Sequence, residues 1–149
     1  DTWKSRGLGD VYKRQGLPRS PTIKEAVSQV VDCIDVHMTE GGCGWLAAIV
    51  KIRKTSEEDG RKAIEAALAG HRSMKMVTIV DEDIDISNPV RVEWAMVTRW
   101  QPDRDTHIFS NQKGSSLDPS RYHDGLTSKV GFDATIHHSD NPEGYMSVQ

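Results

Sequence analysis

The stretch that most constrains the fold runs from Met74 to Arg104, where an apolar run is followed by an acidic turn and a helical pattern. Residues 76–80 are mostly β-branched and uncharged, which predicts a strand buried on both faces. Such strands are typical of parallel sheets that are covered by helices on both sides. We therefore predict an α/β fold, a three-layer α/β/α sandwich with a mixed, mostly parallel sheet.

The acidic turn and the helix start that follow this strand suggest where a site would lie. Residues 81–85 hold four carboxylates in five positions, and these cannot all be buried. Asn88 and Pro89 then supply an N-cap and a first-turn proline for a helix, in which Trp94 and Val97 are expected to face the sheet. Open α/β sheets bind their ligands beyond the carboxyl ends of the strands. Any site that this chain contributes is therefore expected at that edge.

Length and composition limit the classes of protein to consider. A chain of 149 residues with 36% hydrophobic residues can bury one core, so a second domain is not expected. A net charge of −3 without a basic stripe argues against nucleic acid as a partner. No stretch approaches the ~20 apolar residues of a membrane span, and no secretory signal is recognised, which favours the cytoplasm. Cys33 and Cys43 lack CxxC spacing and are expected to be reduced, structural thiols.

The first 15 residues do not resemble part of a fold. They have no hydrophobic period, and Asp10–Gln15 is the peptide that GAT GTG TAT AAG AGA CAG encodes, which resembles a transposon end used in sequencing-library preparation. We interpret residues 1–15 as an adapter-like, non-native segment. Residues 16–149 are then expected to be part of a longer chain that begins upstream.

Periodicity and turn residues predict several further elements. Thr22 and Glu25 match a capping box, and Gly70 is the expected end of a second helix. The predicted helices are a short amphipathic one from Thr22 and Arg61–Leu68, and the predicted strands are Cys33–Met38, Trp45–Arg53 and Asp105–Ser110. Asn111–Leu126 is expected to be a long polar loop, and such loops are usually functional or docked on a partner.

The acidic turn supports one chemical hypothesis from the residues alone. Paired carboxylates such as Asp81 and Asp83 at a strand end can hold Mg²⁺ against a phosphate, as in DxD glycosyltransferases and in haloacid-dehalogenase-like phosphatases. The companion motifs of neither class are recognised in the sequence. The favoured alternative is that these acids cap the following helix and solvate the turn.

Other polar groups give weaker signals. His137, His138 and Asp140 could chelate a metal, but surface histidines explain them better, so no metal ligand is assigned. Glycines 41, 42 and 44 favour a turn over a phosphate cradle. Arg53 and Lys54 end a strand and could meet an anion, although a solvated loop margin explains them equally well.

Four motifs in a fixed order resemble the C-terminal domain of UbiD-type decarboxylases. They are VDEDIDI at 80–86, EWAMVTR at 93–99, GSSLDPS at 114–120 and SKVGFDAT at 128–135. Each motif alone is weak, but the combination in this order is specific. The resemblance covers about residues 23–135.

The resemblance implies a non-oxidative, reversible decarboxylase of aromatic or α,β-unsaturated carboxylic acids. Such enzymes use prenylated flavin mononucleotide (prenylated FMN) together with a divalent metal, manganese or magnesium, and potassium. The flavin-binding domain and the catalytic residues are expected upstream, so none is assigned here, and this chain alone is expected to be inactive. In the family, the C-terminal domain packs against the flavin domain, closes part of the substrate pocket and contributes to homo-oligomer contacts.

The resemblance also assigns two groups of candidate site residues. By motif position, the candidate lid of the substrate pocket is Gly114, Ser115, Ser116 and Leu117. Leu117 would exclude water from the reacting centre, and the two serines could hydrogen-bond a carboxylate.

The second group is Arg53 or Lys54, which would approach the anionic side of the cofactor. Three alternatives stay open beside these assignments. The loop could only dock on a neighbouring subunit, the chain could be a stand-alone metal-dependent enzyme that uses Asp81, Asp83 and Asp85, or it could be a pure oligomerisation module.

Overall fold

The structure is a computed structural model that describes residues 22–42 and 46–137. The adapter-like segment and the predicted positions Cys43, Gly44, His138 and Asp140 lie outside the described residues. The described strands are β1 (Asp32–Met38), β2 (Ala47–Arg53), β3 (Met76–Asp81), β4 (Thr106–Lys113) and β5 (Leu126–Ala134). The helices are residues 22–28, η1 (Glu40–Gly42), α2 (Asp59–Gly70), α3 (Pro89–Arg99) and α4 (Pro102–Asp105).

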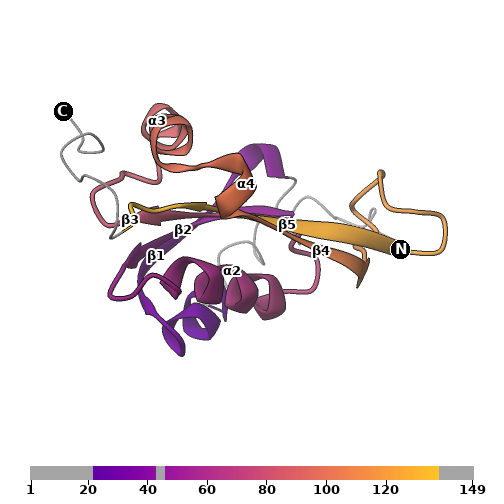
Figure 1. Ribbon diagram of the computed structural model, residues 1–149. Helices are drawn as coiled ribbons and strands as arrows, with labels where there is room; N and C mark the ends of the chain where they lie inside the picture. Colours follow the sequence, from indigo (N-terminus) through magenta and orange to yellow (C-terminus); the bar gives the residue numbers. More distant parts are fainter. Residues whose placement is uncertain (1–21, 43–45, 138–149) are drawn as a thin grey trace.

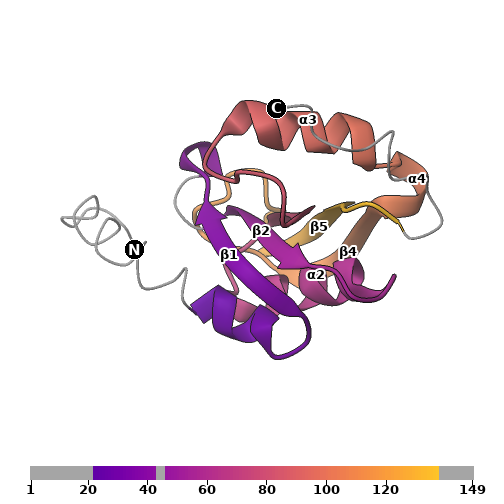
Figure 2. The same ribbon diagram turned by 90° about the vertical axis from the view of Figure 1, so that its left-hand side faces the viewer.

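The strands form one mixed sheet in the order β1-β2-β3-β5-β4. The three central strands are parallel, and the two edge strands pair with them in the antiparallel sense. The helix at 22–28 and α2 cover one face, and α3 covers the other (Figures 1 and 2). The predicted three-layer α/β/α architecture is therefore confirmed. No helix in the described part of the chain is long and apolar enough to cross a membrane.

Both edge strands are irregular. The pairing register of β1 shifts between Cys33 and Asp35, and that of β4 shifts between Phe109 and Gln112. In β4 the shift coincides with Asn111, whose φ of 58° lies in the left-handed region. Register shifts of this kind mark β-bulges, which bend a strand and increase its twist.

The sheet separates two hydrophobic cores. Val77 and Ile79 of β3 pack in the core beneath α2, whereas Val80 packs in the core beneath α3. All three side chains are fully buried, so the predicted two-sided burial of this strand is confirmed. Cys33 is a buried free thiol, as expected, and burial raises its pKa.

Two glycines allow α2 to lie very close to β5. A Cβ on Gly131 would overlap the side chain of Ile64 in α2, and a Cβ on Gly60 would overlap the carboxylate of Asp133 in β5. Only a residue without a side chain fits at either contact. The start of α2 is thereby brought against the end of β5.

Helix α3 begins as predicted but presents a different face. Asn88 is the N-cap, and its side chain accepts a hydrogen bond of 3.0 Å from the Val90 amide. The expectation that Val97 faces the sheet is wrong, because its side chain is 71% exposed. Trp94 is half-buried against the core beneath α3. The fully buried positions of the helix are Val92, Ala95 and Arg99.

The C-terminal third is more regular than predicted. Strand β4 continues to Lys113, so the loop spans 114–125 instead of 111–126. Strand β5, which the sequence pattern did not predict, follows at once and occupies the interior of the sheet. Nearer the start of the chain, the first helix ends at residue 28. Val30 lies beyond it and is 47% exposed, and β1 begins at Asp32.

Candidate functional site

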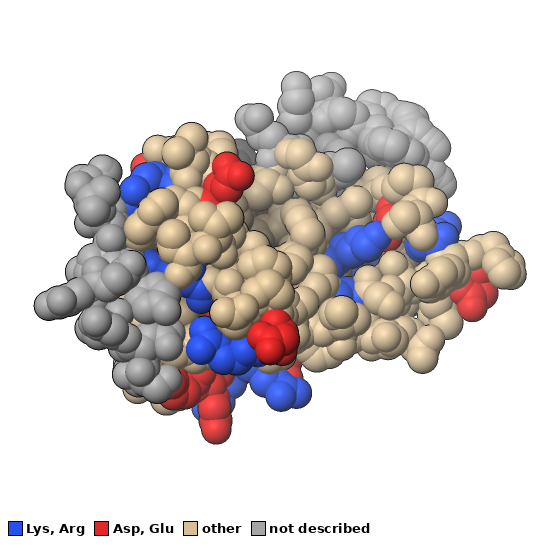
Figure 3. Space-filling view, turned by 45° about the horizontal axis from the view of Figure 1, so that its top comes forward, with Lys and Arg blue, Asp and Glu red and all other residues tan. Residues whose placement is uncertain are grey.

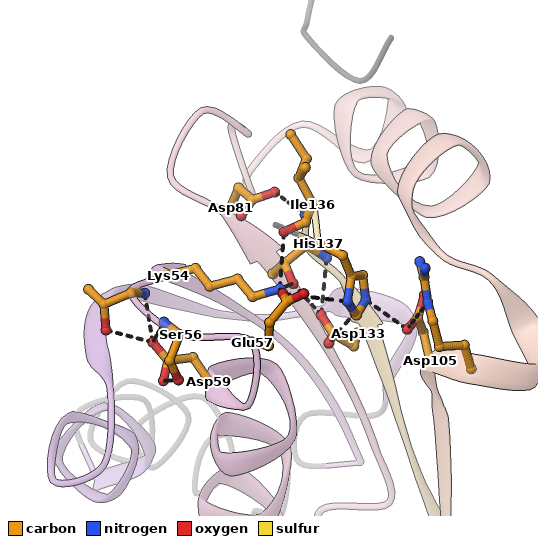
Figure 4. Close-up of polar contacts among 12 residues, drawn as sticks. Lys54, Ser56, Glu57, Asp59, Asp81, Asp105, Asp133, Ile136 and His137 are labelled. Carbon is orange, nitrogen blue, oxygen red and sulfur yellow. Dashed lines mark hydrogen bonds and ion pairs between the residues drawn. The ribbon is translucent and has the colours of Figure 1, made fainter. Parts of the chain in front are cut away.

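Polar side chains from four segments converge where the parallel strands β2, β3 and β5 end (Figure 4). We call this group the carboxyl-edge cluster, and its members are Lys54, Glu57, Asp105, Asp133 and His137. Lys54 directly follows β2, Asp105 ends α4, and Asp133 is the second-last residue of β5, four residues before His137. The sequence predicted that a site would lie at this edge, and the cluster is found there.

His137 is the centre of the cluster. Its Nε2 lies 2.9 Å from Oδ1 of Asp105 and 4.0 Å from Oδ2 of Asp133, and its Nδ1 lies 3.6 Å from Oε1 of Glu57. The side chain is only 14% exposed. The prediction that His137 is a surface histidine is therefore wrong, because the fold encloses it between three carboxylates.

Each of the two aspartates beside His137 is held by further contacts. Asp105 accepts hydrogen bonds from Nε and Nη2 of Arg104 (2.9 and 3.0 Å) and from the Gln101 amide (2.8 Å). Burial acts to raise the pKa of Asp105, but these hydrogen bonds outweigh it, and the pKa lies below its ordinary value. Oδ1 of Asp133 accepts from the amide and hydroxyl of Thr135 (3.1 and 2.5 Å).

The two predicted cofactor residues differ sharply from each other. Lys54 is only 5% exposed, and its Nζ donates to Thr135 Oγ1 (3.1 Å) and the Ile136 carbonyl (3.0 Å) and pairs with Glu57 (3.2 Å). Lys54 is therefore a buried residue that connects segments of the cluster. Arg53 is 58% exposed and pairs with Asp32 and Glu82 at the surface (3.4 and 3.2 Å).

The acidic turn has a structural partner that the sequence did not reveal. Arg99 is fully buried, binds Asp83 through both terminal nitrogens (2.9 and 2.8 Å) and reaches Asp81 at 3.0 Å. Burial raises the pKa of Asp81, whereas the hydrogen bonds from Arg99 lower the pKa of Asp83. The expectation that these acids solvate the turn is wrong for Asp81, whose side chain is only 15% exposed, whereas Asp83 is accessible to solvent and binds Arg99 as well. Their guanidinium partner takes the place that a metal ion of a DxD site would need.

Asp85 behaves as the acidic turn was expected to, and Glu82 is likewise exposed. Asp85 is exposed and accepts hydrogen bonds from the Ser87 amide and hydroxyl at 3.1 and 2.7 Å. These bonds lower its pKa. Asp85 therefore shapes the turn before α3 and takes no part in the carboxyl-edge cluster.

The predicted lid residues lie at the other end of the sheet, in the 114–125 loop (Figure 1). Ser116 is exposed, Leu117 is half-buried, and Oγ of Ser115 accepts from the Leu117 amide at 3.1 Å. The Gly114 amide donates to the carbonyl of Gly125 at 2.8 Å, which closes the base of the loop.

The loop is anchored by Asp118. This side chain is buried, pairs with Lys75 at 2.8 Å and accepts from the Ser120 amide and hydroxyl at 2.9 and 2.7 Å. Burial acts to raise its pKa, but the bonds from Lys75 and Ser120 outweigh it and lower the pKa to about 2. The loop is thus a fixed, internally bonded structure.

The structure therefore does not bring the two groups of candidate residues together. Strand β5 joins the loop to the carboxyl-edge cluster, and nine extended residues span roughly 30 Å. One small substrate cannot touch both the Gly114–Leu117 segment and Arg53 of the same chain.

A pocket of about 230 Å³ lies between α2 and the β4–β5 pair. Its lining residues are Glu65, Leu68, Ala69, Phe109, Gln112 and Lys129. Lys129 is buried, donates to the Arg72 carbonyl at 2.8 Å, and has its pKa lowered by burial. Sequence reasoning missed this residue because it lies in a strand that was not predicted.

Charged side chains of both signs lie beside one another on the face shown in Figure 3. The described residues on this face form no broad basic surface of the kind that nucleic-acid binding requires.

Comparison with known proteins identifies relatives of this chain. Residues 14–134 match the family described as 3-octaprenyl-4-hydroxybenzoate carboxy-lyase C-terminal domain, UbiD_C. The anhydromevalonate phosphate decarboxylase of Methanothermobacter thermautotrophicus is 51% identical over 122 residues, which are 81% of this chain and 29% of that protein.

Solved structures agree with this match. The UbiD-class enzyme HmfF from Pelotomaculum thermopropionicum in complex with FMN has a TM-score of 0.85 and 36% identity, over 90% of this chain and 30% of that one. An evolved dimeric form of HmfF in complex with prenylated FMN has a TM-score of 0.71 and 34% identity, over 85% and 26% of the two chains.

This chain thus spans less than a third of the length of the relatives that it matches. The family match covers most of the sequence, and the fold agrees with that of a UbiD-class enzyme over nearly all of it. The chain belongs to the UbiD family and corresponds to its C-terminal domain.

Proposed function

We propose that this chain is the C-terminal part of a non-oxidative, reversible decarboxylase that works with prenylated FMN. The observation that carries the proposal is the agreement with HmfF over 90% of the chain, since that enzyme binds FMN and its evolved form binds prenylated FMN. The flavin, a divalent metal (manganese or magnesium) and potassium would be held mainly by an N-terminal domain. When bound, the prenylated flavin supplies the electron sink for loss of CO₂.

The substrate class follows from the relatives. The sequence suggested aromatic or α,β-unsaturated carboxylic acids. The 51% identity to a protein named anhydromevalonate phosphate decarboxylase favours a non-aromatic, phosphorylated acid as the first substrate to test. A cytoplasmic location, which the sequence favoured, stays a prediction.

Arg53 is the residue that fits the anionic side of the cofactor better. Its guanidinium is exposed at the carboxyl edge of the sheet, and a cation there can pair with a phosphate. Lys54 fits less well, because its ammonium group is buried and engaged by Thr135, Ile136 and Glu57. We propose that Lys54 has a structural role within the carboxyl edge of the sheet and that Arg53 faces the flavin domain.

We propose that the Gly114–Leu117 segment forms a wall of a pocket and not a moving lid, because Asp118 beside it is held by Lys75 and Ser120. Its separation of roughly 30 Å from Arg53 along β5 means that the two cannot line one pocket within a chain. If both serve an active site, the loop contributes to the pocket of a neighbouring subunit in a homo-oligomer. This arrangement unites the lid and docking hypotheses.

The outer face of α3 supports contact with the rest of the protein. Val90 and Val97 lie seven residues apart on this helix and are each 71% exposed. Apolar side chains at helical spacing on a surface often mark an interface. We propose that they pack against the N-terminal flavin domain, which accounts for most of the length of the relatives.

A chimera tests the proposed function. The C-terminal 29% of the Methanothermobacter enzyme would be replaced by the matching residues of this chain, and CO₂ release would be measured with prenylated FMN. We expect activity on anhydromevalonate phosphate above that on aromatic acids, and none from this chain alone. Turnover by this chain alone would contradict the proposal, as would a folded, flavin-loaded chimera that decarboxylates none of the acids.

A further inference from the structure

The carboxyl-edge cluster contains three potential metal ligands that face one another. Nε2 of His137 lies 2.9 Å from Oδ1 of Asp105 and 4.0 Å from Oδ2 of Asp133, and one ligand atom from each of the three residues lies within 4.8 Å of the others. The ligand atoms come from α4, from β5 and from the segment that follows β5 (Figure 4). Both aspartates are buried, and His137 is nearly so.

Each of the three residues is also oriented by a further partner. Nδ1 of His137 faces Glu57 at 3.6 Å, and Asp105 accepts a hydrogen bond from Arg104. Oδ1 of Asp133 accepts from Thr135, and its Oδ2 faces the histidine. A carboxylate on the second ring nitrogen of a ligand histidine is a recurring feature of metal sites. The cluster therefore supplies both the ligands and the groups that would orient them.

The distances can be compared with those between the ligands of one metal ion. The 2.9 Å contact between His137 and Asp105 suits a hydrogen bond or two neighbouring ligands. The 4.0 Å separation between His137 and Asp133 is too long for a hydrogen bond. Ligands at about 2.1 Å from one ion lie ~3.0–3.4 Å apart, so closing the present separations of up to 4.8 Å would take side-chain movements on the order of 1 Å.

We propose that Asp105, Asp133 and His137 bind a first-row divalent cation, of the Zn²⁺ or Mn²⁺ class. One imidazole and two carboxylates form a nitrogen–oxygen set that suits these ions. Three protein ligands leave at least one coordination position for water or an anion. The three carboxylates around His137 outnumber the nearby cations Lys54 and Arg104, which favours an added positive charge.

Titration of the metal-free 149-residue chain tests this site. MnCl₂ and ZnCl₂ would be added in an isothermal titration calorimeter, and thermal unfolding would be followed with and without the ion. We expect one ion per chain and a higher Tm with the ion, because a ligand that binds only the folded state stabilises it. His137→Gln and Asp133→Asn should each weaken binding at least tenfold.

Matched controls separate this site from adventitious binding. His123 and Asp124 are exposed in the loop at the other end of the sheet, so His123→Gln and Asp124→Asn should leave the affinity unchanged. Glu57 is 45% exposed, and Glu57→Gln should fold normally and weaken binding about tenfold by freeing the ring of His137. Circular dichroism would verify the fold of every variant.

Three outcomes would overturn the proposal. The first is a folded chain that binds neither ion stoichiometrically. The second is binding that both His137→Gln and Asp133→Asn leave intact. The third is binding that depends on His137 but not on Asp133 or Glu57, which would assign the ion to other ligands. The readout is metal affinity, so the result does not depend on whether the chain serves a decarboxylase.

Discussion

The two ends of the sheet each bury an aspartate in a polar network, yet the networks are built differently. At the amino end, where β5 begins, Asp118 is bonded by Ser120 of its own loop, by Lys75 before β3 and by Thr127 of β5. At the carboxyl edge, Asp133 and His137 meet groups from several segments, and Oδ2 of Asp133 stays 4.0 Å from the ring. The first network ties a loop to the sheet. The second brings side chains of several segments together, and these are the groups that we propose to bind a metal ion.

The largest effect is expected from removing the cation beneath the acidic turn. Arg99→Met leaves Asp81 and Asp83 without their buried partner, which costs about 3–5 kcal/mol of stability. Urea unfolding followed by circular dichroism measures this loss. Arg61→Met is the matched control, because its pair with Glu65 is exposed and should be worth less than about 0.5 kcal/mol. Equal losses for both variants would refute the structural role of Arg99.

A smaller loss is expected where α2 touches the cluster. Gly60→Ala places a methyl group against the carboxylate of Asp133, and such overpacking costs about 1–3 kcal/mol. The unfolding free energy measures the effect. Gly41→Ala is the control, since a Cβ there meets nothing within 4 Å. If the two alanine variants prove equally stable, α2 and β5 lie further apart than described.

At the amino end, Asp118→Asn should cost about 1–2 kcal/mol at pH 7, because a charged hydrogen-bond acceptor is lost. The cost should depend on pH. The folded pKa of about 2 lies below the unfolded value of about 3.9, so the contribution is full above pH 4 and disappears as the pH falls toward 2.

Unfolding free energies of wild type and Asp118→Asn, measured from pH 7 down to pH 2, test this dependence. The two curves should converge below pH 4. The exposed Asp103→Asn variant should run parallel to wild type throughout. Curves that stay separate at pH 2 would show that the carboxylate charge is not what anchors the loop.

Within the proposed chimera, Leu117→Ala should cost less than about 1 kcal/mol of stability, because the side chain is only half-buried. It should change the preference among carboxylic acids while the oligomer stays intact, as measured by kcat/KM and by light scattering. If only the assembly changes, the loop docks on a neighbour and does not meet the substrate.

The smallest effect on stability is expected at Arg53. Arg53→Gln removes two exposed ion pairs, worth less than about 0.5 kcal/mol together. In the chimera it should nevertheless weaken flavin binding severalfold, measured by fluorescence quenching. Lys62→Gln, an exposed change on α2, should leave the affinity unaltered. Unchanged flavin affinity in both variants would remove Arg53 from the cofactor site.

Local rules predicted the elements that depend on short-range chemistry. The uncharged β-branched run gave β3, and the Asn88-Pro89 pair gave the start of α3, because burial and capping act within a few residues. The four family motifs also identified the family, as the comparisons confirm. These features need no knowledge of the tertiary structure.

The rotation of α3 could not be predicted in this way. Apolar spacing pointed to Val97, but Arg99 must face inward to reach Asp81 and Asp83, and both valines at the ends of the helix are exposed as a result. Asp81 is largely buried, and leaving it without a cation would cost about as much as or more than burying one valine gains. A distant ion pair therefore overrides the local pattern.

Strand β5 was missed because its buried face is polar. Thr127, Lys129, Gly131 and Asp133 point inward in alternation, whereas Val130 and Phe132 lie on the half-buried side. A search for alternating apolar residues finds no core face in such a segment. The cluster around His137 was missed because Asp105 lies 32 residues before His137 in the sequence. The strand that was not predicted, β5, brings the two side chains together.

The irregular outer strands have a consequence for how copies of this domain can assemble. A flat, exposed strand is a template for extending the sheet into another molecule, but β1 and β4 both carry bulges that misalign their free hydrogen-bonding groups. Growth of a continuous intermolecular sheet is therefore disfavoured at both margins.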